Sequence, residues 1–339
     1  MESQVLTDRR TLELQERPRP EPEDGSVVLE VDACGVCMTD YHMYHGTFPV
    51  DTPVVLGHES TGTVVEVGAG TQNVEVGQRV ALFPSVPCGS CRACRAGDHN
   101  RCTNLIGIGA AADTVVDGSF AEYVTVPEQS VVPVDGLTPD VAALTEPLAC
   151  CVHGVDQTSI QTGDTVVVIG AGSIGLLLMQ TFDAAGAGQL IVSEPVPDRR
   201  RLAEELGADV TIDPYSENVV ETVDRHTDHV DIAAEVVGTM PTVEQAIELP
   251  SPGGETLIFG VPPQDQTIEI SPFDVYYNES DILGSFGSNL DTTQRAVELL
   301  KYDRVEAEPI ITERYGLSDL ERAFEQMEDQ DGLKKLIRP

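Results

Sequence analysis

The second half of the chain alternates between short apolar runs and longer amphipathic segments. Residues 164–187, DTVVVIGAGSIGLLLMQTFDAAGA, read as an apolar strand, a glycine turn and an apolar helix. Further strands are predicted at QLIVSEP, DVTID, VDIAAEVVG, ETLIFGV and DILGSFG, with helices among them at DRRRLAEELGA, near 216–226 and near 241–249. Apolar strands that alternate with helices are typical of a doubly wound parallel sheet.

The first 150 residues follow a different pattern, in which short β-branched runs are separated by glycine turns. Strands are predicted at SVVLEVDA (26–33), STGTVVEVG (60–68), GQRVALF (77–83) and FAEYVTVP (120–127). We therefore expect an α/β chain with a β-rich domain at 1–150 and a doubly wound domain at 151–288. The segment 289–339 contains two predicted helices and a terminal KKLIRP, which we expect to return to the first domain.

Composition and charge limit the partners of the protein. No apolar run approaches the length of a membrane span, and MESQVLTDRR lacks the features of a signal peptide, so we expect a cytoplasmic protein without a membrane partner. The chain has 57 acidic and 20 basic side chains, a formal net charge of −37. Such a surface repels the phosphates of nucleic acid and anionic lipid. The acids are spread along the whole chain, which predicts adaptation to molar salt in a halophile, where the Debye length falls to about 3 Å.

A glycine-rich turn follows the first strand of the predicted parallel sheet. Gly170, Gly172 and Gly175 form G-x-G-x-x-G between a strand and a helix, and Glu194 follows about twenty residues later. This context predicts a dinucleotide whose pyrophosphate lies at the helix N-terminus. Glu194 can accept hydrogen bonds from ribose hydroxyls and would repel a 2′-phosphate, so we expect NAD rather than NADP. The arginines Arg199 and Arg200 at this edge keep NADP as the alternative.

Four cysteines fall within one short polar stretch. Cys88, Cys91, Cys94 and Cys102 have the spacing of a closed tetrahedral Zn²⁺ site, and in a cytoplasmic chain clustered cysteines more often bind metal than form disulfides. With all four positions filled by sulfur, no position is open for substrate. We therefore predict a structural zinc ion in this segment.

A second, open metal site is predicted earlier in the chain. Cys37, His58 and one carboxylate would make three protein ligands and leave the fourth position for water or alcohol. The candidate carboxylates include Glu59, next to His58, and Glu146 in TEPLAC. One thiolate, one neutral imidazole and one carboxylate balance the charge of Zn²⁺, so the ion would remain a Lewis acid that stabilises an alkoxide.

Together these motifs carry a family resemblance. GVCMTDYH, GHES, the four-cysteine lobe, EPLACCVHGVD and GAGSIG are similar to the motifs of the zinc-containing medium-chain dehydrogenases, over essentially the entire chain. Within that superfamily the chain most resembles the polyol (sorbitol-type) and threonine dehydrogenase branches. The resemblance implies a GroES-like catalytic domain at 1–150 with a structural zinc lobe at about 86–103, a Rossmann NAD-binding domain at 151–288, and an active site between them.

The resemblance also implies roles for metal-site residues. Cys37 and His58 match the constant catalytic zinc ligands. Glu146 and Glu59 both match carboxylates that bind zinc in relatives, and the resting ligand stays open between the two. Asp40 matches an acid that orients the zinc-bound histidine.

A proton relay and cofactor contacts are implied in the same way. Thr39 and His42 match a relay that carries the alcohol proton toward solvent. The matched cofactor contacts are Gly170, Gly172, Ile174, Gly175, Glu194, Arg199, Phe259, Gly260, Val261, Ser285 and Phe286.

These assignments predict a zinc-dependent oxidoreductase that transfers a hydride from a secondary alcohol, a polyol or sugar alcohol, to NAD. L-threonine 3-dehydrogenase and glucose 1-dehydrogenase are the close alternatives. A non-catalytic zinc-binding scaffold is the alternative from another class, but such proteins tend to lose ligands that this chain keeps. The resemblance implies two zinc ions per chain and a homotetramer, with a dimer as the alternative.

Overall fold

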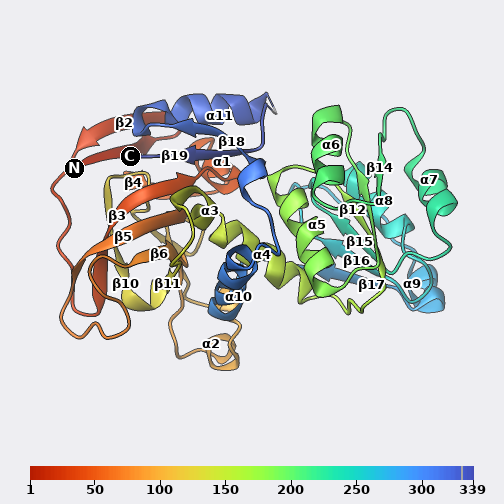
Figure 1. Ribbon diagram of the computed structural model, residues 1–339, viewed down its shortest axis with the longest axis horizontal. Helices are drawn as coiled ribbons and strands as arrows, with labels where there is room; N and C mark the ends of the chain where they lie inside the picture. The colour runs from red at the N-terminus through yellow and green to blue at the C-terminus, as the bar shows by residue number, and fades with distance from the viewer. Residues whose placement is uncertain (330) are drawn as a thin grey trace. The chain divides into compact units, whose positions relative to one another are not determined.

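The computed structural model describes residues 1–329 and 331–339 and divides them into two compact units (Figure 1). Unit 1 contains Met1–Ala149, Ser288–Asp303 and Ala307–Pro339. Unit 2 contains Cys150–Gly287 and Arg304–Glu306. The divisions expected after residues 150 and 288 lie beside these observed ones, and residues 304–306 are a return to unit 2 that the sequence did not indicate.

Unit 1 is built mainly of strands. Its largest sheet has the order β11-β6-β5-β3-β19-β18, with β10 also paired to β3. In that order these strands are Val131–Pro133, Arg79–Leu82, Glu59–Val67, Ser26–Gly35, Lys334–Ile337, Ile311–Tyr315 and Tyr123–Pro127. A second sheet, β2-β1-β4, comprises Thr11–Glu16, Glu2–Asp8 and Val54–Val55. The helices are α1 (Met38–Tyr44), α3 (Pro139–Ala143), α10 (Leu290–Lys301) and α11 (Leu320–Glu328), and α4 (Thr145–Val155) crosses the division between the units.

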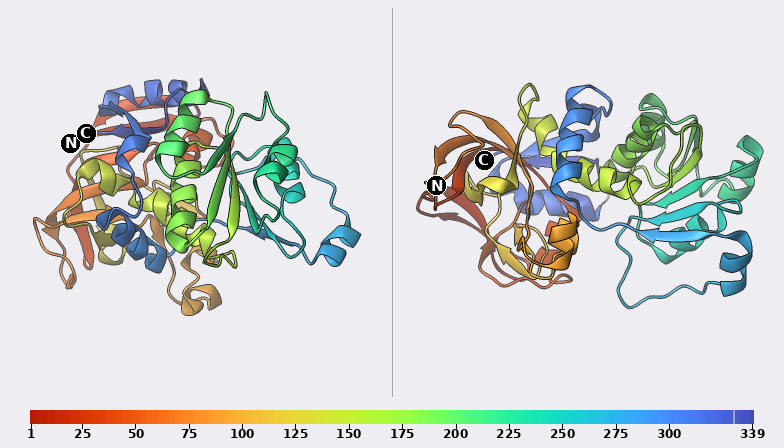
Figure 2. Two further views of the ribbon diagram at one scale, coloured as in Figure 1. Left: turned by 45° about the vertical axis from the view of Figure 1, so that its right-hand side comes forward. Right: turned by 90° about the horizontal axis from the view of Figure 1, so that it is seen from below.

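The long strand β3 organises unit 1. One face of β3, which carries Val27, Leu29 and Val31, is buried along its whole length, and the neighbours β5, β10 and β19 all pair with the strand antiparallel. At its end, Gly35 lies opposite Glu59 of β5 and Leu336 of β19. The C-terminal segment therefore lies in unit 1, and the two ends of the chain are near each other (Figure 2).

A small lobe projects from the sheet of unit 1. It contains the three-stranded sheet β7-β8-β9, formed by Ser85–Val86, Ile106–Ile108 and Thr114–Val116. The five-residue helix α2 (Arg92–Ala96) and a 3-10 turn at His99–Arg101 lie between its first two strands in sequence. Further 3-10 turns in unit 1 are Glu128–Ser130, Glu308–Ile310 and Leu317–Asp319.

Unit 2 has the doubly wound sheet that the alternating pattern predicts. The strand order is β14-β13-β12-β15-β16-β17, and every neighbouring pair is parallel. In that order the strands are Val210–Ile212, Gln189–Ser193, Thr165–Ile169, Ile232–Glu235, Glu255–Ile258 and Asp281–Gly284. The helices are α5 (Ser173–Ala185), α6 (Pro197–Glu205), α7 (Val219–His226), α8 (Met240–Glu248) and α9 (Pro272–Asn278).

Both faces of the parallel sheet are covered by helices. Val219 and Val223 of α7 and Ala246 of α8 share one buried cluster with Val167 and Ile169 of β12. Figure 1 shows α5 and α6 next to each other on the opposite face, as right-handed crossovers require. The order reverses beside β12, and in such sheets ligands bind at the carboxyl ends of the strands at this point.

Within the described ranges, the chain forms no helix with both the length and the apolar character needed to cross a membrane.

Candidate functional site

Three metal-binding side chains come together in unit 1. Cys37 caps the N-terminus of α1, just after β3 ends, and Glu59 opens β5 opposite the last residue of β3. This pairing brings Cys37 beside His58 and Glu59. Their ligand atoms, a thiol sulfur, an imidazole nitrogen and a carboxylate oxygen, lie within 4.8 Å of one another. The donor set fits a divalent cation of the zinc type.

Asp40 orients two members of this cluster. It is fully buried; its Oδ2 accepts the backbone N–H of Cys37 at 2.9 Å and its Oδ1 lies 3.3 Å from Nδ1 of His58. Nδ1 also lies 3.3 Å from the carbonyl oxygen of Gly109, which leaves Nε2 of His58 for a metal. Burial lowers the pKa of His58, but the charge and hydrogen bonds of Asp40 and Cys37 outweigh it and hold the pKa well above its usual range. The site therefore favours positive charge.

Glu59 also contacts a lysine from the C-terminal strand. Nζ of Lys334 in β19 lies 2.8 and 2.6 Å from the two oxygens of Glu59, and these residues are only 3% and 1% exposed. Burial lowers the pKa of Lys334, but the charges of Glu59, Cys37 and Glu146 raise it, with a net upward shift. A Cβ at Gly35 would lie 2.0 Å from Oε2 of Glu59, so only glycine leaves room for this carboxylate.

The second predicted carboxylate lies outside this cluster. Glu146 is half-buried in the first turn of α4. Among the described residues, the carboxylate that lies with Cys37 and His58 is that of Glu59 and not that of Glu146. No motif in the sequence indicates a role for Lys334. The available signal was its rarity, because the chain has only three lysines, two of them adjacent in KKLIRP.

Thr39 and His42 lie three residues apart on α1 and so share one helix face. The backbone N–H of Thr39 donates to Sγ of Cys37 at 3.4 Å, so this face begins at the metal cluster. The ring of His42 lies 4.9 Å from that of Phe48, centroid to centroid. The pKa of His42 is lowered, mainly by burial and to a smaller extent by the charge of His45. Its imidazole is therefore neutral at neutral pH and able to accept a proton.

The four cysteines of the lobe converge on one point. Their Sγ atoms lie within 4.8 Å of one another: Cys91 and Cys94 are 3.4 Å apart, and Cys88 and Cys94 are 3.9 Å apart. A tetrahedral site with Zn–S bonds of about 2.3 Å has sulfur separations of about 3.8 Å. Backbone hydrogen bonding from Ser90 is the main cause that lowers the pKa of Cys88 to about 5. All eight cysteines, Cys102 included, lie in the described part of the chain and are free of disulfides.

The glycine turn of unit 2 has the geometry of a phosphate site. Gly170, which follows β12, has φ +103°, a conformation that favours glycine. A Cβ at Gly175 would lie 2.0 Å from the carbonyl oxygen of Gly170, so the first turn of α5 packs directly on this loop. A Cβ built at Gly172 meets no described atom within 4 Å, which leaves the backbone open at the N-terminus of this 13-residue helix. Ile174 lies half-buried in the same turn.

Glu194 follows β13 and is 3% exposed. Its Oε2 accepts the N–H of Ala171 in the glycine turn at 2.7 Å, and its Oε1 accepts the N–H of Val196 at 2.9 Å. Each oxygen retains a lone pair for a ribose hydroxyl. Arg199 is half-buried in α6. Arg200 donates to the carbonyl oxygen of Glu194 at 2.6 Å and pairs with Asp213, a supporting role that the sequence did not indicate.

The remaining predicted cofactor contacts lie at the carboxyl ends of the last two strands. Val261 and Phe286 are 62% and 66% exposed there, although both are apolar. The hydroxyl of Ser285 lies at the same edge, and its Oγ is buried without a hydrogen-bond partner among the described residues. The segments concerned are Phe259, Gly260 and Val261 after β16, and Ser285 and Phe286 after β17.

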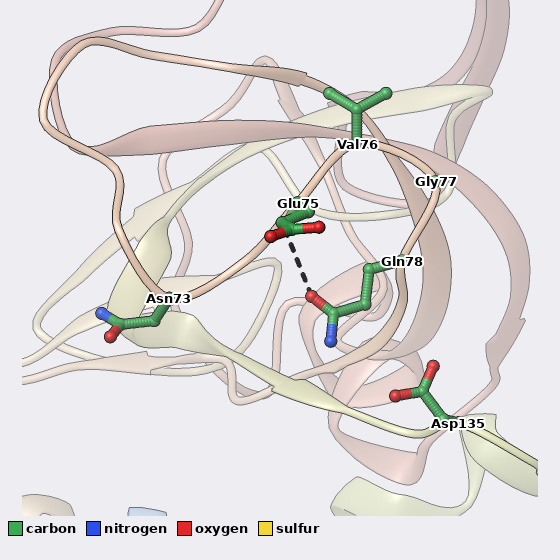
Figure 3. A pocket seen from close by; sticks show the side chains of 6 residues that line it. All are labelled: Asn73, Glu75, Val76, Gly77, Gln78 and Asp135. Carbon is green, nitrogen blue, oxygen red and sulfur yellow. Dashed lines mark hydrogen bonds between the residues drawn. The ribbon is translucent and has the colours of Figure 1, made fainter.

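A separate hollow of about 430 Å³ lies in unit 1 (Figure 3). It is formed by a turn in which the backbone N–H of Glu75 donates to Oε1 of Gln78. None of the predicted metal, relay or cofactor residues lines it. The lining residues are Asn73, Glu75, Val76, Gly77, Gln78 and Asp135.

Comparison with known proteins assigns the family. Residues 23–136 match the model of the alcohol dehydrogenase GroES-like domain, and residues 173–302 match that of the zinc-binding dehydrogenases. The sorbitol dehydrogenase of Halalkalibacterium halodurans is 35% identical over 333 residues, 96% of this chain and 95% of that protein. The L-threonine 3-dehydrogenase of Pyrococcus horikoshii is 37% identical over 324 residues, 93% of this chain and 91% of that protein.

A solved structure agrees. A protein of Sinorhizobium meliloti 1021, designated a zinc-binding dehydrogenase and bound to NADP, has a TM-score of 0.94 and 38% identity, covering 100% of this chain and 99% of that one. The GroES-like and Rossmann folds implied by the motifs are thereby confirmed, as is a zinc-binding, NAD(P)-dependent dehydrogenase. The chain belongs to the zinc-containing medium-chain dehydrogenases of the alcohol dehydrogenase superfamily.

Proposed function

We propose that this dehydrogenase oxidises the secondary alcohol of a polyol or sugar alcohol and transfers its hydride to NAD. The observation that carries the proposal is the convergence of Cys37, His58 and Glu59 next to the helix face of Thr39 and His42. A thiolate, an imidazole and a carboxylate together balance the charge of Zn²⁺. An alcohol bound at this cluster would release its proton toward that helix face, which begins beside Cys37.

When bound, Zn²⁺ supplies Lewis-acid stabilisation of negative charge on the alcohol oxygen, and the nicotinamide accepts the hydride. The chain's own residues position the groups and move the proton. Asp40 fixes the ring of His58 and the backbone of Cys37. Thr39 passes the proton, and His42 receives it because its lowered pKa keeps the imidazole neutral.

The four-cysteine lobe has a different role. We assign Cys88, Cys91, Cys94 and Cys102 to a structural zinc ion, because four sulfurs at tetrahedral separations leave no position for substrate. This site stabilises the lobe and takes no part in turnover.

We assign NAD as the preferred cofactor. The carboxylate of Glu194 is fixed by two backbone N–H groups at the end of β13, where it would accept the ribose hydroxyls and repel a 2′-phosphate. The half-buried Arg199 and the NADP in the Sinorhizobium meliloti relative make NADP the competitor for the test.

L-threonine 3-dehydrogenase activity is the second candidate, because the Pyrococcus horikoshii enzyme of that name is 37% identical over nearly the whole chain. We further expect a cytoplasmic homotetramer, with a dimer as the alternative, on the basis of the family resemblance. Size-exclusion chromatography with light scattering in molar salt decides the assembly.

The deciding experiment is a substrate panel in molar-salt buffer. Sorbitol, xylitol, arabinitol, glucose and threonine are each offered with NAD and with NADP, and formation of reduced cofactor is followed. The proposal predicts the highest kcat/KM for a polyol with NAD. Turnover confined to threonine would replace it with the second candidate, and the His58→Ala variant is the inactive control.

A further inference from the structure

A buried glutamate of unit 2 takes no part in the chemistry described so far. Glu235 is the last residue of β15 and is 0% exposed. Its Oε1 accepts the backbone N–H groups of Val237 and Gly238, at 2.8 and 2.7 Å, and the hydroxyl of Thr242 at 2.7 Å. Its Oε2 has no hydrogen-bond partner among the residues that the structure describes. Three donors on one buried oxygen fix the course of the turn after β15.

The backbone of Glu235 also binds the loop that follows β16. The carbonyl oxygen of Glu235 accepts the N–H groups of both Phe259 and Gly260, each at 2.9 Å. A Cβ at Gly260 would lie 2.4 Å from the backbone nitrogen of Gly238 and 2.8 Å from Oε2 of Glu235. Two glycines therefore bring the turn after β15 and the loop after β16 into direct backbone contact, with the carboxylate beside them.

The turn that Glu235 fixes also contacts the glycine motif. Ile169, at the end of β12, lies opposite Glu235 in the sheet. Gly170 comes next, and a Cβ there would lie 2.7 Å from Cγ2 of Val237. The position of Val237, and with it the room beside Gly170, thus depends on the hydrogen bond from its N–H to Glu235.

We propose that Glu235 is a positioning residue for the dinucleotide. It sets the glycine turn at Gly170 and the loop Phe259–Val261 relative to each other, so that cofactor affinity depends on a carboxylate that does not touch the cofactor. The inference rests on the proposed function, because it requires these segments to bind a nicotinamide dinucleotide.

The test separates positioning from simple stabilisation. Glu235→Gln and Glu235→Ala are compared with Glu255→Gln, which alters another buried carboxylate of the same sheet. Glu255 is 8% exposed and accepts the backbone N–H of Ser159 at 2.8 Å. It is the first residue of β16, so it lies at the amino end of its strand, whereas Glu235 lies at the carboxyl end of β15. For the full-length, zinc-loaded protein in molar salt, the Kd for NADH is measured from the fluorescence of the reduced nicotinamide, and the unfolding temperature is measured without ligand. The chain has no tryptophan, so the fluorescence change comes from the ligand.

Glu235→Ala is expected to weaken NADH binding by about tenfold and Glu235→Gln by about threefold, while Glu255→Gln lowers the unfolding temperature but leaves Kd within about twofold. If the alanine variant does not fold, the glutamine variant decides. Wild-type affinity in a destabilised Glu235→Gln protein would overturn the positioning role and leave the proposed function standing. Failure of the wild-type protein to bind NADH or NADPH would overturn both.

Discussion

Replacing Lys334 with methionine would remove the ammonium group that contacts Glu59 in the core of unit 1. Both residues are almost fully buried, with Nζ 2.6 Å from the nearer carboxylate oxygen. Breaking a buried pair on one side leaves an uncompensated charge, which costs about 3–5 kcal/mol. Because each kcal/mol shifts the unfolding temperature of a domain of this size by about 2–4 °C, we expect a fall of about 6–20 °C. Salt cannot screen a pair this deeply buried, so the loss should persist in molar salt.

The assay is thermal unfolding of metal-free protein, followed by circular dichroism in molar salt. The double variant Lys334→Met/Glu59→Gln removes both charges and should recover most of the stability. Adding Zn²⁺ should raise the unfolding temperature of Lys334→Met more than that of the wild-type protein, because in the variant the cation also replaces the lost positive charge beside Glu59. A single variant that unfolds within about 1 °C of the wild-type protein would refute this electrostatic account of the cluster.

Three further predictions follow from the site. His58→Ala should lose one zinc ion per chain, measured by elemental analysis, and all turnover, measured by NADH formation. Cys91→Ser should instead lower the unfolding temperature of the lobe first. The reverse pattern would exchange the roles of the two sites. Burial and the charge of His45 lower the pKa of His42, so the fall of alcohol oxidation with acid should come at a lower pH than an exposed histidine would give, as the imidazole becomes protonated. His42→Gln should abolish that acid limb of the pH profile, and an unchanged profile would exclude the relay. Dilution into low salt should unfold the protein, because 57 acidic side chains repel one another when unscreened. Unfolding is followed by circular dichroism, and full stability in dilute buffer would contradict halophilic adaptation.

The parallel sheet could be predicted because its strands carry their own signal. TVVVI, QLIVS and the later strands are continuous apolar runs, and their burial on both faces requires that composition. The predicted helices near 216–226 and 241–249 are observed as α7 and α8, with boundaries shifted by up to three residues. The sequence analysis does not predict helix α9 (Pro272–Asn278), which is only seven residues long and whose aromatic residues Phe273, Tyr276 and Tyr277 are exposed rather than packed on the sheet.

Unit 1 was harder to predict from sequence. Helix α1 begins with a capping box made by Cys37 and Asp40, and cysteine is not among the residues that usually signal a helix start. The pair of Glu59 and Lys334 joins residues 275 positions apart through the pairing of β19 with β3, a contact that no local pattern encodes. Glu235 could not be singled out for a similar reason, since one glutamate at the end of an apolar strand carries no sign of its partners.

Anomalous X-ray scattering at the zinc absorption edge, from crystals grown in molar salt, tests the central claim most directly. The account predicts two peaks per chain, one among the sulfurs of Cys88, Cys91, Cys94 and Cys102, and one bound by Cys37, His58 and a single glutamate with one coordination position open. A second peak surrounded by four protein donors in every state, or no peak beside Cys37 at all, would contradict it.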